Sequence, residues 1–294
     1  MKIAVIGAGL GGCITAMQYD LLGQEVEIYH DPNVPIERVG QGTTCDVVSL
    51  MCGALNQNWS HNDIKATKKW GINYKNWGKK DVFHPFSPEK TSCHYIPSLL
   101  REEVLKHFKV VDKNIKDPEE EIDADWIYDC RGRPGDLEDY HILTNPINSV
   151  VLATGDPDPE MKYTDAIATP DGWTFIIPNQ DNKSYGYLYN DTITSTQAAR
   201  HDFIERFNLP DDSATNISFE NYVAKNLFVG ERTILNGNRY SFLEPLEATS
   251  TRLYQSVCRF VWDYMQGNRT KIESNYNIRR VVQQLETFIL WHYQ

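Results

Sequence analysis

Three glycines near the amino terminus are the residues whose type and spacing point most directly to chemistry. Gly7, Gly9 and Gly12 form a GxGxxG pattern directly after the apolar run Lys2–Ile6. In such a turn the first glycine allows a tight bend, the second lets a phosphate approach the backbone, and the third lets helix and strand pack closely. The free N–H groups at the start of the following helix attract anions. The pattern therefore predicts that a dinucleotide binds at this turn through its pyrophosphate. Leu10, which follows Gly9 in the turn, belongs to this predicted cofactor site.

A ribose contact is expected where the second strand of such a fold ends, usually through an acidic residue. The corresponding positions hold His30 and Asp31. Asp31 is the better candidate by charge and His30 by position, and either could also be a plain loop residue. The ribose contact is therefore predicted at one of these two residues.

The elements that must position this site follow from the hydrophobic pattern. A strand at Lys2–Ile6, a helix at Cys13–Leu22 and a strand at Glu25–Tyr29 make the opening βαβ unit of a dinucleotide-binding fold. Residues 43–92 show little periodicity, and we expect them to form a long excursion that carries function rather than core. Further predicted elements are a helix at Ser98–His107, strands at Val110–Asp112, Trp126–Asp129 and Asn226–Gly230, alternating strands at Ser149–Ala153, Tyr163–Ala168, Trp173–Ile177 and Gly186–Asn190, and helices at Glu247–Tyr264 and from Tyr276 to the end.

Charge and composition exclude several function classes. The 294 residues carry a formal net charge of −11, from 29 Lys and Arg against 40 Asp and Glu. This balance offers no uniformly positive field for nucleic acid or anionic membranes, so neither is an expected partner. No apolar run approaches the roughly 20 residues of a membrane helix, and a cytoplasmic protein is expected. The six cysteines lack CxxC pairs, so we expect reduced thiols and no metal site.

FAD, rather than NAD, is favoured by two later segments. Asp129–Gly132 follows a predicted strand and resembles the segment with which FAD monooxygenases return to the adenosine side. Asn236–Asn238 stands where such enzymes carry Gly-Asp against the ribityl chain, with Gly237 matching and Asn238 in place of the aspartate. Asparagine donates and accepts hydrogen bonds but carries no charge, so FAD binding is expected to persist with altered affinity.

Four further segments resemble motifs of the tryptophan halogenase family of flavin-dependent halogenases. Residues 39–44 resemble its second glycine-rich flavin loop, which adds Gly40, Gln41, Gly42, Thr43 and Thr44 to the expected cofactor site. Trp173–Pro178 resembles the signature WxWxIP, with Phe175 in place of the second tryptophan. Phe242–Ser250 resembles FxEPLESTG, with Ala248 and Ser250 as departures, and Lys69–Trp77 followed by Phe83–Phe86 resembles the segment that holds the catalytic lysine and the start of the substrate pocket.

The resemblance runs from residue 1 to Phe288–Tyr293 and implies an α/β fold, Rossmann-like and FAD-binding, with an inserted antiparallel β-sheet layer and C-terminal helices. We expect one unit over 1–294, with cofactor parts at 1–142 and 222–266, an inserted substrate-side sheet at 143–221 and a C-terminal helix at 267–294. Members of the family usually continue into a helical region that closes over the substrate. Its absence here suggests an open pocket, for a larger substrate or one covered by a partner subunit.

The resemblance also implies the reaction and the catalytic residues. Reduced FAD, dioxygen and a halide ion give hypohalous acid, which travels through a tunnel to an electron-rich aromatic substrate. Lys69 is the expected catalytic lysine, because Lys68 would point to a different face; a solvated basic face is the alternative. Glu247 is expected to accept the proton released from the ring, or else to be only a helix-terminal charge, while Glu244 is expected to be structural at the start of the helix.

Halide and substrate contacts follow from the same motifs. The turn at Thr249 and Ser250 is expected to bind halide through backbone N–H groups, and Ser250 would strain this turn if the glycine it replaces has positive φ. Trp173 and Phe175 are expected to screen the flavin from the substrate. His84 and Phe86 are expected to stack on the substrate or, alternatively, to form an ordered turn.

A separate flavin reductase is the implied source of reduced FAD, and homo-oligomerisation stays open. Two other functions remain alternatives at this stage. One is a flavin monooxygenase or oxidase without halide use, and the other is a non-catalytic flavin-binding protein.

Overall fold

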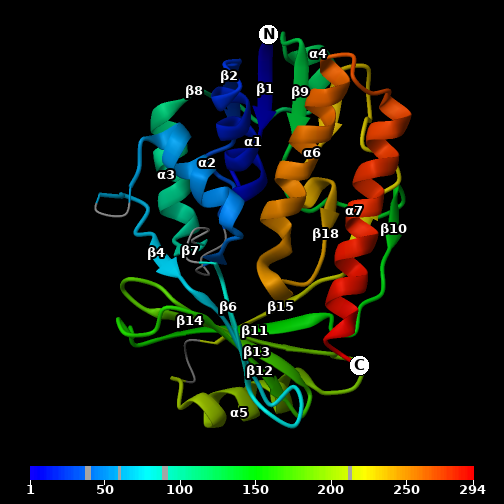
Figure 1. Cartoon of the computed structure of the whole chain (residues 1–294). Coiled ribbons are helices and arrows are strands. Elements are labelled where there is room, and N and C mark those ends of the chain that lie inside the picture. Colours follow the sequence, from blue (N-terminus) through cyan, green and yellow to red (C-terminus); the bar gives the residue numbers. More distant parts are fainter. Residues whose placement is uncertain (37–40, 59–60, 88–91, 211–213) are drawn as a thin grey trace.

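The molecule consists of two stacked halves. The structure, a computed structural model, describes residues 1–36, 41–58, 61–87, 92–210 and 214–294. One half holds a parallel sheet and most of the helices, and the other holds a seven-stranded sheet (Figure 1). The long helix α7 (Lys271–Trp291) runs along one side of the first half and ends beside the second (Figure 1). The carboxyl terminus therefore lies next to the seven-stranded sheet.

The parallel sheet has the strand order β17-β9-β1-β2-β8. Its strands are β1 (Lys2–Ile6), β2 (Glu25–His30), β8 (Lys109–Asp112), β9 (Trp126–Asp129) and β17 (Thr233–Leu235). Ile3, Ala4 and Val5 of β1 are completely buried, as expected for the centre of a sheet that is covered on both faces. This confirms the predicted Rossmann-like α/β fold.

Helices cover this sheet and form most of the core. They are α1 (Leu10–Leu21), α2 (Cys45–Leu55), α3 (Pro97–His107), the short α4 (Pro118–Glu121), α6 (Thr249–Met265) and α7. Helix α1 packs against α2, α3 and α6. Helix α7 begins at Lys271 rather than at Tyr276, because Thr270 and Glu273 form a capping box that satisfies free N–H groups at its start. No helix in the described part of the chain is both long and apolar enough to cross a bilayer.

The seven-stranded sheet has the order β15-β11-β14-β13-β12-β5-β6. Its strands are β5 (Gly71–Lys75), β6 (Val82–Pro85), β11 (Ser149–Gly155), β12 (Thr164–Thr169), β13 (Gly172–Pro178), β14 (Lys183–Tyr189) and β15 (Thr215–Ser218). All neighbours are antiparallel except β12 and β5, so the sheet is mixed. Strands β5 and β6 come from outside residues 143–221. Helix α5 (Thr196–Phe207) covers the face away from the parallel sheet (Figure 1).

Two small antiparallel sheets complete the structure. The first joins β3 (Gln41–Gly42), β7 (Ser92–Tyr95) and β4 (Thr67–Lys69) in the order β3-β7-β4. The second joins β10 (Tyr140–Ile142), β16 (Tyr222–Ala224) and β18 (Ser241–Phe242). The first sheet connects the two halves and carries Lys69 at the end of β4.

The sequence predictions for two of these segments are wrong. Residues 43–92 contribute to the core, because Val47 and Met51 of α2 are buried against α1. The strand predicted at Asn226–Gly230 is a loop, and the chain rejoins the parallel sheet later, at β17. Val229 in this loop is 54% exposed, whereas Ile234 of β17 is fully buried. The apolar run that can be buried against the sheet is therefore the one that forms the strand.

Candidate active site

The glycine turn between β1 and α1 has the geometry of a phosphate cradle. Gly7 has a φ of 97°, and a Cβ on Gly12 would lie 1.9 Å from the carbonyl oxygen of Gly7, so neither position accepts a side chain without rearrangement. A Cβ on Gly9 would meet nothing within 4 Å. No side chain caps α1, whose first turn carries no acidic residue. Open space beside uncapped N–H groups fits a pyrophosphate.

These glycines make a matched pair of variants. We expect Gly12→Ala to destabilise the protein, because its Cβ would overlap the backbone of the same turn. We expect Gly9→Ala to keep its thermal stability but to bind FAD more weakly, because its Cβ would project into the space left for the phosphates. Thermal unfolding without cofactor and fluorescence titration with FAD measure the two effects. Equal FAD affinity in Gly9→Ala and the unsubstituted protein would contradict this assignment.

A second close approach joins the turn to the carboxyl-terminal part of the cofactor site, and the sequence analysis missed it. A Cβ on Gly11 would lie 2.5 Å from the Cα of Gly237, which has a φ of 64°. The 3₁₀ turn Gly237–Arg239 therefore lies directly against the start of α1. The signal was present as the glycine next to Gly12 that the GxGxxG pattern does not require.

The polar residues of this turn and of the β9 end are largely paired with each other. Asn238 accepts a 2.6 Å hydrogen bond from the Tyr254 hydroxyl through Oδ1. Asp129 is 3% exposed and binds Arg131 at 2.7 Å and Arg239 at 3.3 Å. The carboxylate of Asp129 thus holds two guanidinium groups that the sequence analysis did not single out. Gly132 follows with a φ of 83° and open space around it.

At the end of β2, His30 and Asp31 differ in environment. His30 is buried, and burial together with the charge of Arg101 lowers its pKa. Asp31 Oδ1 accepts a 2.9 Å hydrogen bond from the backbone N–H of Asn33, so this carboxylate already stabilises its own loop. The choice between them as a ribose ligand stays a prediction. Arg101 is a positive charge near this edge that the sequence analysis missed.

The second glycine-rich loop is described only in part. Gly40 lies outside the described residues, as does the side chain of Gln41. Thr43 Oγ1 lies 3.3 Å from Ser92 Oγ, and Thr44 Oγ1 lies 3.4 Å from Thr251 Oγ1 in α6. The loop therefore contacts both β7 and the start of α6.

Lys69 is buried beside this loop. Its side chain is 2% exposed, and its Nζ lies 5.3 Å from the centroid of the Phe86 ring. A Cβ on Gly42 would lie 3.2 Å from Nζ. No hydrogen bond or ion pair joins Nζ to any described residue. Burial lowers the pKa of Lys69 to about 8, while the charge of Glu247 acts in the opposite direction.

Lys68 has a different environment, as the alternation of a strand predicts. Its Nζ lies 5.6 Å from the Trp70 ring centroid, and the residue is partly exposed. The alternative that Lys69 belongs to a solvated basic face is therefore wrong.

His94 is a neighbour of Lys69 that the sequence analysis missed. It is completely buried on β7, and its Nε2 lies 2.8 Å from Thr164 Oγ1. Burial and then the charge of Lys69 lower its pKa well below the usual value. The imidazole is neutral, so Lys69 and His94 do not repel each other as two cations.

Glu247 lies outside the predicted helix. Glu247 has a φ of 68° and Ala248 a φ of 53°, and α6 begins at Thr249. The helix expected from Glu247 therefore begins two residues later, and Glu247 lies in the 3₁₀ turn Leu246–Ala248 directly before it. The alternative that Glu247 is only a charge at the helix N-terminus stays a prediction. Ser250 lies in the first turn of α6 without positive φ, so the strain expected there falls on Glu247 and Ala248 instead.

The start of α6 provides free backbone N–H groups. Its first helical residues are Thr249 and Ser250, no side chain caps it, and its first turn has no acidic residue. Such a terminus carries a partial positive charge that favours an anion. This geometry is compatible with the halide site predicted there.

Aromatic side chains line the sheet side of the site. Trp173 and Phe175 on β13 are both buried, with ring centroids 6.2 Å apart, and Trp77 lies 6.3 Å from Trp173. The Phe175 ring lies against Gly186, where a Cβ would approach it to 2.2 Å. His84 is exposed on β6, with its ring centroid 6.0 Å from that of Phe86. Phe86 is thus brought next to Lys69, and His84 lies farther out.

Glu244 is a strongly perturbed acid in the same region. It is 1% exposed and accepts a 2.6 Å hydrogen bond from the Tyr293 hydroxyl. Its Oε2 and Trp173 Nε1 have no hydrogen-bond partner in the described structure. Burial raises the pKa of Glu244 to about 7. The sequence analysis assigned it a structural role and did not predict this perturbation.

The chain is similar to halogenases in both sequence and structure. It is 29% identical to tryptophan 7-halogenase RebH of Lentzea aerocolonigenes over 158 residues, which cover 47% of this chain and 30% of that protein. The fold matches BrvH, a flavin-dependent halogenase from Brevundimonas sp. BAL3, with a TM-score of 0.84 and 17% identity over 99% of this chain and 78% of that one. It also matches a tryptophan halogenase from Shewanella frigidimarina NCIMB 400, with a TM-score of 0.86 and 15% identity over 100% and 77% of the two chains.

These structural likenesses show the fold, and the sequence alignment with RebH spans less than a third of that relative. The profile of the tryptophan halogenase family matches residues 2–99 and 102–294, nearly the whole chain. The protein therefore belongs to the tryptophan halogenase family.

Proposed function

We propose that this protein is an FAD-dependent halogenase that uses reduced flavin, dioxygen and halide to halogenate an electron-rich aromatic small molecule. One observation carries the proposal: Lys69 is buried without a polar partner among the described residues, and its pKa is lowered to about 8. An unpaired buried cation costs stability, so a structural role does not account for it. A chemical role for the amine does.

The residues around the first glycine turn fit FAD. Gly7, Gly9 and Gly12 would hold its pyrophosphate, and the loop that contains Gly42 would contact it near Lys69. When bound, reduced FAD would supply the two electrons that activate dioxygen, and dioxygen is the oxidant that converts a halide ion to hypohalous acid. The free N–H groups at Thr249 and Ser250 would hold the halide.

Lys69 and Glu247 would divide the remaining chemistry. With a pKa of about 8, roughly a tenth of Lys69 is the neutral amine at pH 7. This amine can hydrogen-bond hypohalous acid, or attack its halogen and release water to give a haloamine. The halogen then passes to the aromatic ring while the departing nitrogen, or the departing hydroxide, takes up a proton from solvent, and Glu247 takes the ring proton. Phe86 would orient the ring, while Trp173 and Phe175 would help to separate it from the flavin side.

The test is a reaction with a flavin reductase, FAD and a panel of indoles and phenols, in chloride, bromide or iodide. We expect products whose mass increases by the halogen supplied. Oxygenated products that do not depend on halide would favour a monooxygenase. Flavin reduction without any product across the panel would favour a non-catalytic flavin-binding protein.

A further inference from the structure

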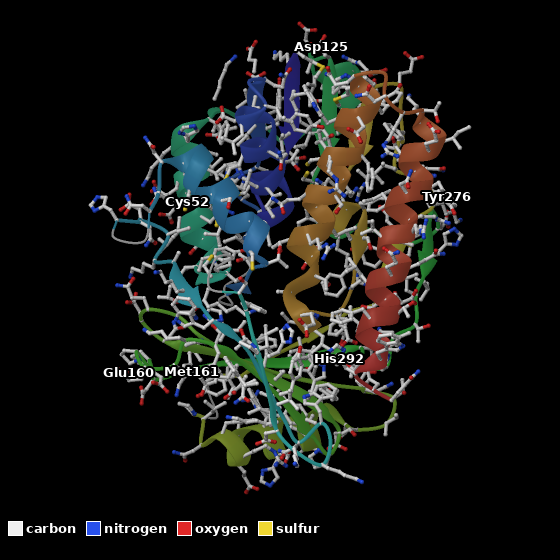
Figure 2. All side chains as sticks on the ribbon, in the orientation of Figure 1. Cys52, Asp125, Glu160, Met161, Tyr276 and His292 are labelled. Atoms are coloured by element: carbon white, nitrogen blue, oxygen red, sulfur yellow. The ribbon has the colours of Figure 1, made fainter. Side chains whose placement is uncertain are left out.

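The end of α7 contacts both carboxylates of the segment Glu244–Glu247. His292 Nε2 lies 3.5 Å from Glu247 Oε1, and the Tyr293 hydroxyl donates to Glu244 Oε1 at 2.6 Å. Figure 2 shows His292 at the end of α7, where this helix meets the seven-stranded sheet. Two successive residues thus fix both ends of a short acidic segment.

The contact of His292 Nδ1 determines whether Nε2, which faces Glu247, can donate a hydrogen bond. Nδ1 lies 3.0 Å from the carbonyl oxygen of Phe288. A carbonyl only accepts hydrogen bonds, so Nδ1 carries a proton. In a neutral imidazole Nε2 would then be an acceptor, and it could not donate to a carboxylate. A favourable contact between Nε2 and the Glu247 carboxylate, 3.5 Å away, therefore needs a second proton on the imidazole.

The surroundings of His292 support the protonated form. Its ring lies 5.5 Å from Tyr74, 6.0 Å from Trp77 and 5.1 Å from Phe288, measured between centroids. Burial lowers the pKa of His292, but the hydrogen bonds to Glu247 and to backbone carbonyls outweigh burial and raise it. The titratable groups that face or contact the imidazole are Glu247, Glu244, Tyr74 and its neighbour Tyr293.

We propose that His292 is a positioning residue for Glu247, and that its imidazolium holds the Glu247 carboxylate in place in the left-handed turn. This inference rests on the proposed function, because the position of Glu247 matters to the rate only if it accepts the ring proton. A left-handed backbone conformation is strained for a residue other than glycine, and an ion pair helps to offset that strain. Because the pKa of His292 is raised, the pair is complete below about 6.5 and is lost as pH rises through the raised pKa.

Titration of His292 by NMR tests the pair without any turnover. The His292 resonance in histidine-labelled protein is assigned by its absence in His292→Gln, and exposed His201 serves as the reference. We expect the pKa of His292 to lie above about 6.5 and to fall in Glu247→Gln, while the His201 resonance is unaffected by that substitution. A pKa of His292 that Glu247→Gln leaves unmoved would overturn the pair.

Kinetics tests the role. His292→Gln keeps an N–H donor near Glu247 but cannot titrate, so we expect kcat to fall about 10- to 100-fold with KM and FAD affinity unchanged. The decline in rate as pH rises through the pKa of His292 should also disappear. Tyr293→Phe removes the bond to Glu244 and should keep that decline. A loss of FAD affinity or of folding in His292→Gln, with no change in the pH profile, would show a merely structural role.

The two proposals can fail separately. If the unsubstituted protein halogenates and His292→Gln does so at the same rate and pH dependence, the role of His292 is overturned and the function stands. If no condition gives halogenation, the proposed function falls, and the NMR titration still decides whether the Glu247 pair exists.

Discussion

Lys69→Met is expected to abolish halogenation while making the protein more stable. Methionine has a similar length and fills the same buried space, but it can neither hydrogen-bond hypohalous acid nor form a haloamine. We expect the rate to fall at least about 10²-fold, with FAD affinity unchanged. Lowering the pKa of a lysine from 10.5 to about 8 corresponds to a cost on the order of 3 kcal/mol, which the variant avoids near pH 7.

The sign of the stability effect can be checked against pH. The ammonium of Lys69 binds its proton less tightly in the folded than in the unfolded protein, so stability rises as pH increases from about 8 towards 10.5. Lys69→Met should lack this rise. Urea unfolding at several pH values measures it, and Lys68→Met, at the partly exposed neighbour, is the matched control. Normal halogenation by Lys69→Met would show that this lysine is not the catalytic one.

Glu247→Gln is expected to lower kcat about 10²-fold, because an amide cannot accept the ring proton. The same change removes the charge that raises the pKa of Lys69, so that pKa should fall below about 8. The limb of the pH profile that reports Lys69 should therefore move to lower pH.

Steady-state rates between pH 6 and pH 10, roughly the range in which Lys69 titrates, measure these two effects. Glu160→Gln, at an exposed position in the turn between β11 and β12, is the control (Figure 2). If Glu247→Gln keeps the full rate, another group accepts the proton. Buried Glu244, whose pKa is raised to about 7, would be the next candidate.

The amino-terminal part of the fold could be predicted from local pattern. Lys2–Ile6 is a continuous apolar run, and the glycines that follow it permit only a few backbone paths, so strand, turn and helix follow from short-range physics. Alternation also predicted the strands that form β13 and β14, although it did not predict the pairing of Phe175 with Gly186. Alternation identifies a strand but not its neighbour.

The candidate site was only partly predictable, because its most informative properties come from long-range contacts. Lys69 could be singled out by resemblance, but its burial depends on β7 and on Phe86, which lie elsewhere in the sequence. The segment that contains His292 and Tyr293 was recognised, but neither residue was given a role. Their partners lie far away in the sequence: Glu244, for example, precedes Tyr293 by 49 residues. The left-handed turn at Glu247 was missed because neither Glu247 nor Ala248 is a glycine.

The left-handed turn at Glu247 and Ala248 opposes thermal stability to the precise placement of a carboxylate. Two consecutive residues with side chains adopt a backbone conformation that glycine would adopt with less strain. Selection for thermal stability alone would favour glycine in this segment, because glycine removes the backbone strain. The backbone would then be more flexible, and a carboxylate in the segment would no longer have a fixed position. Laboratory evolution towards thermostability would thus be expected to reach this segment early and to yield hardier proteins that are slower catalysts.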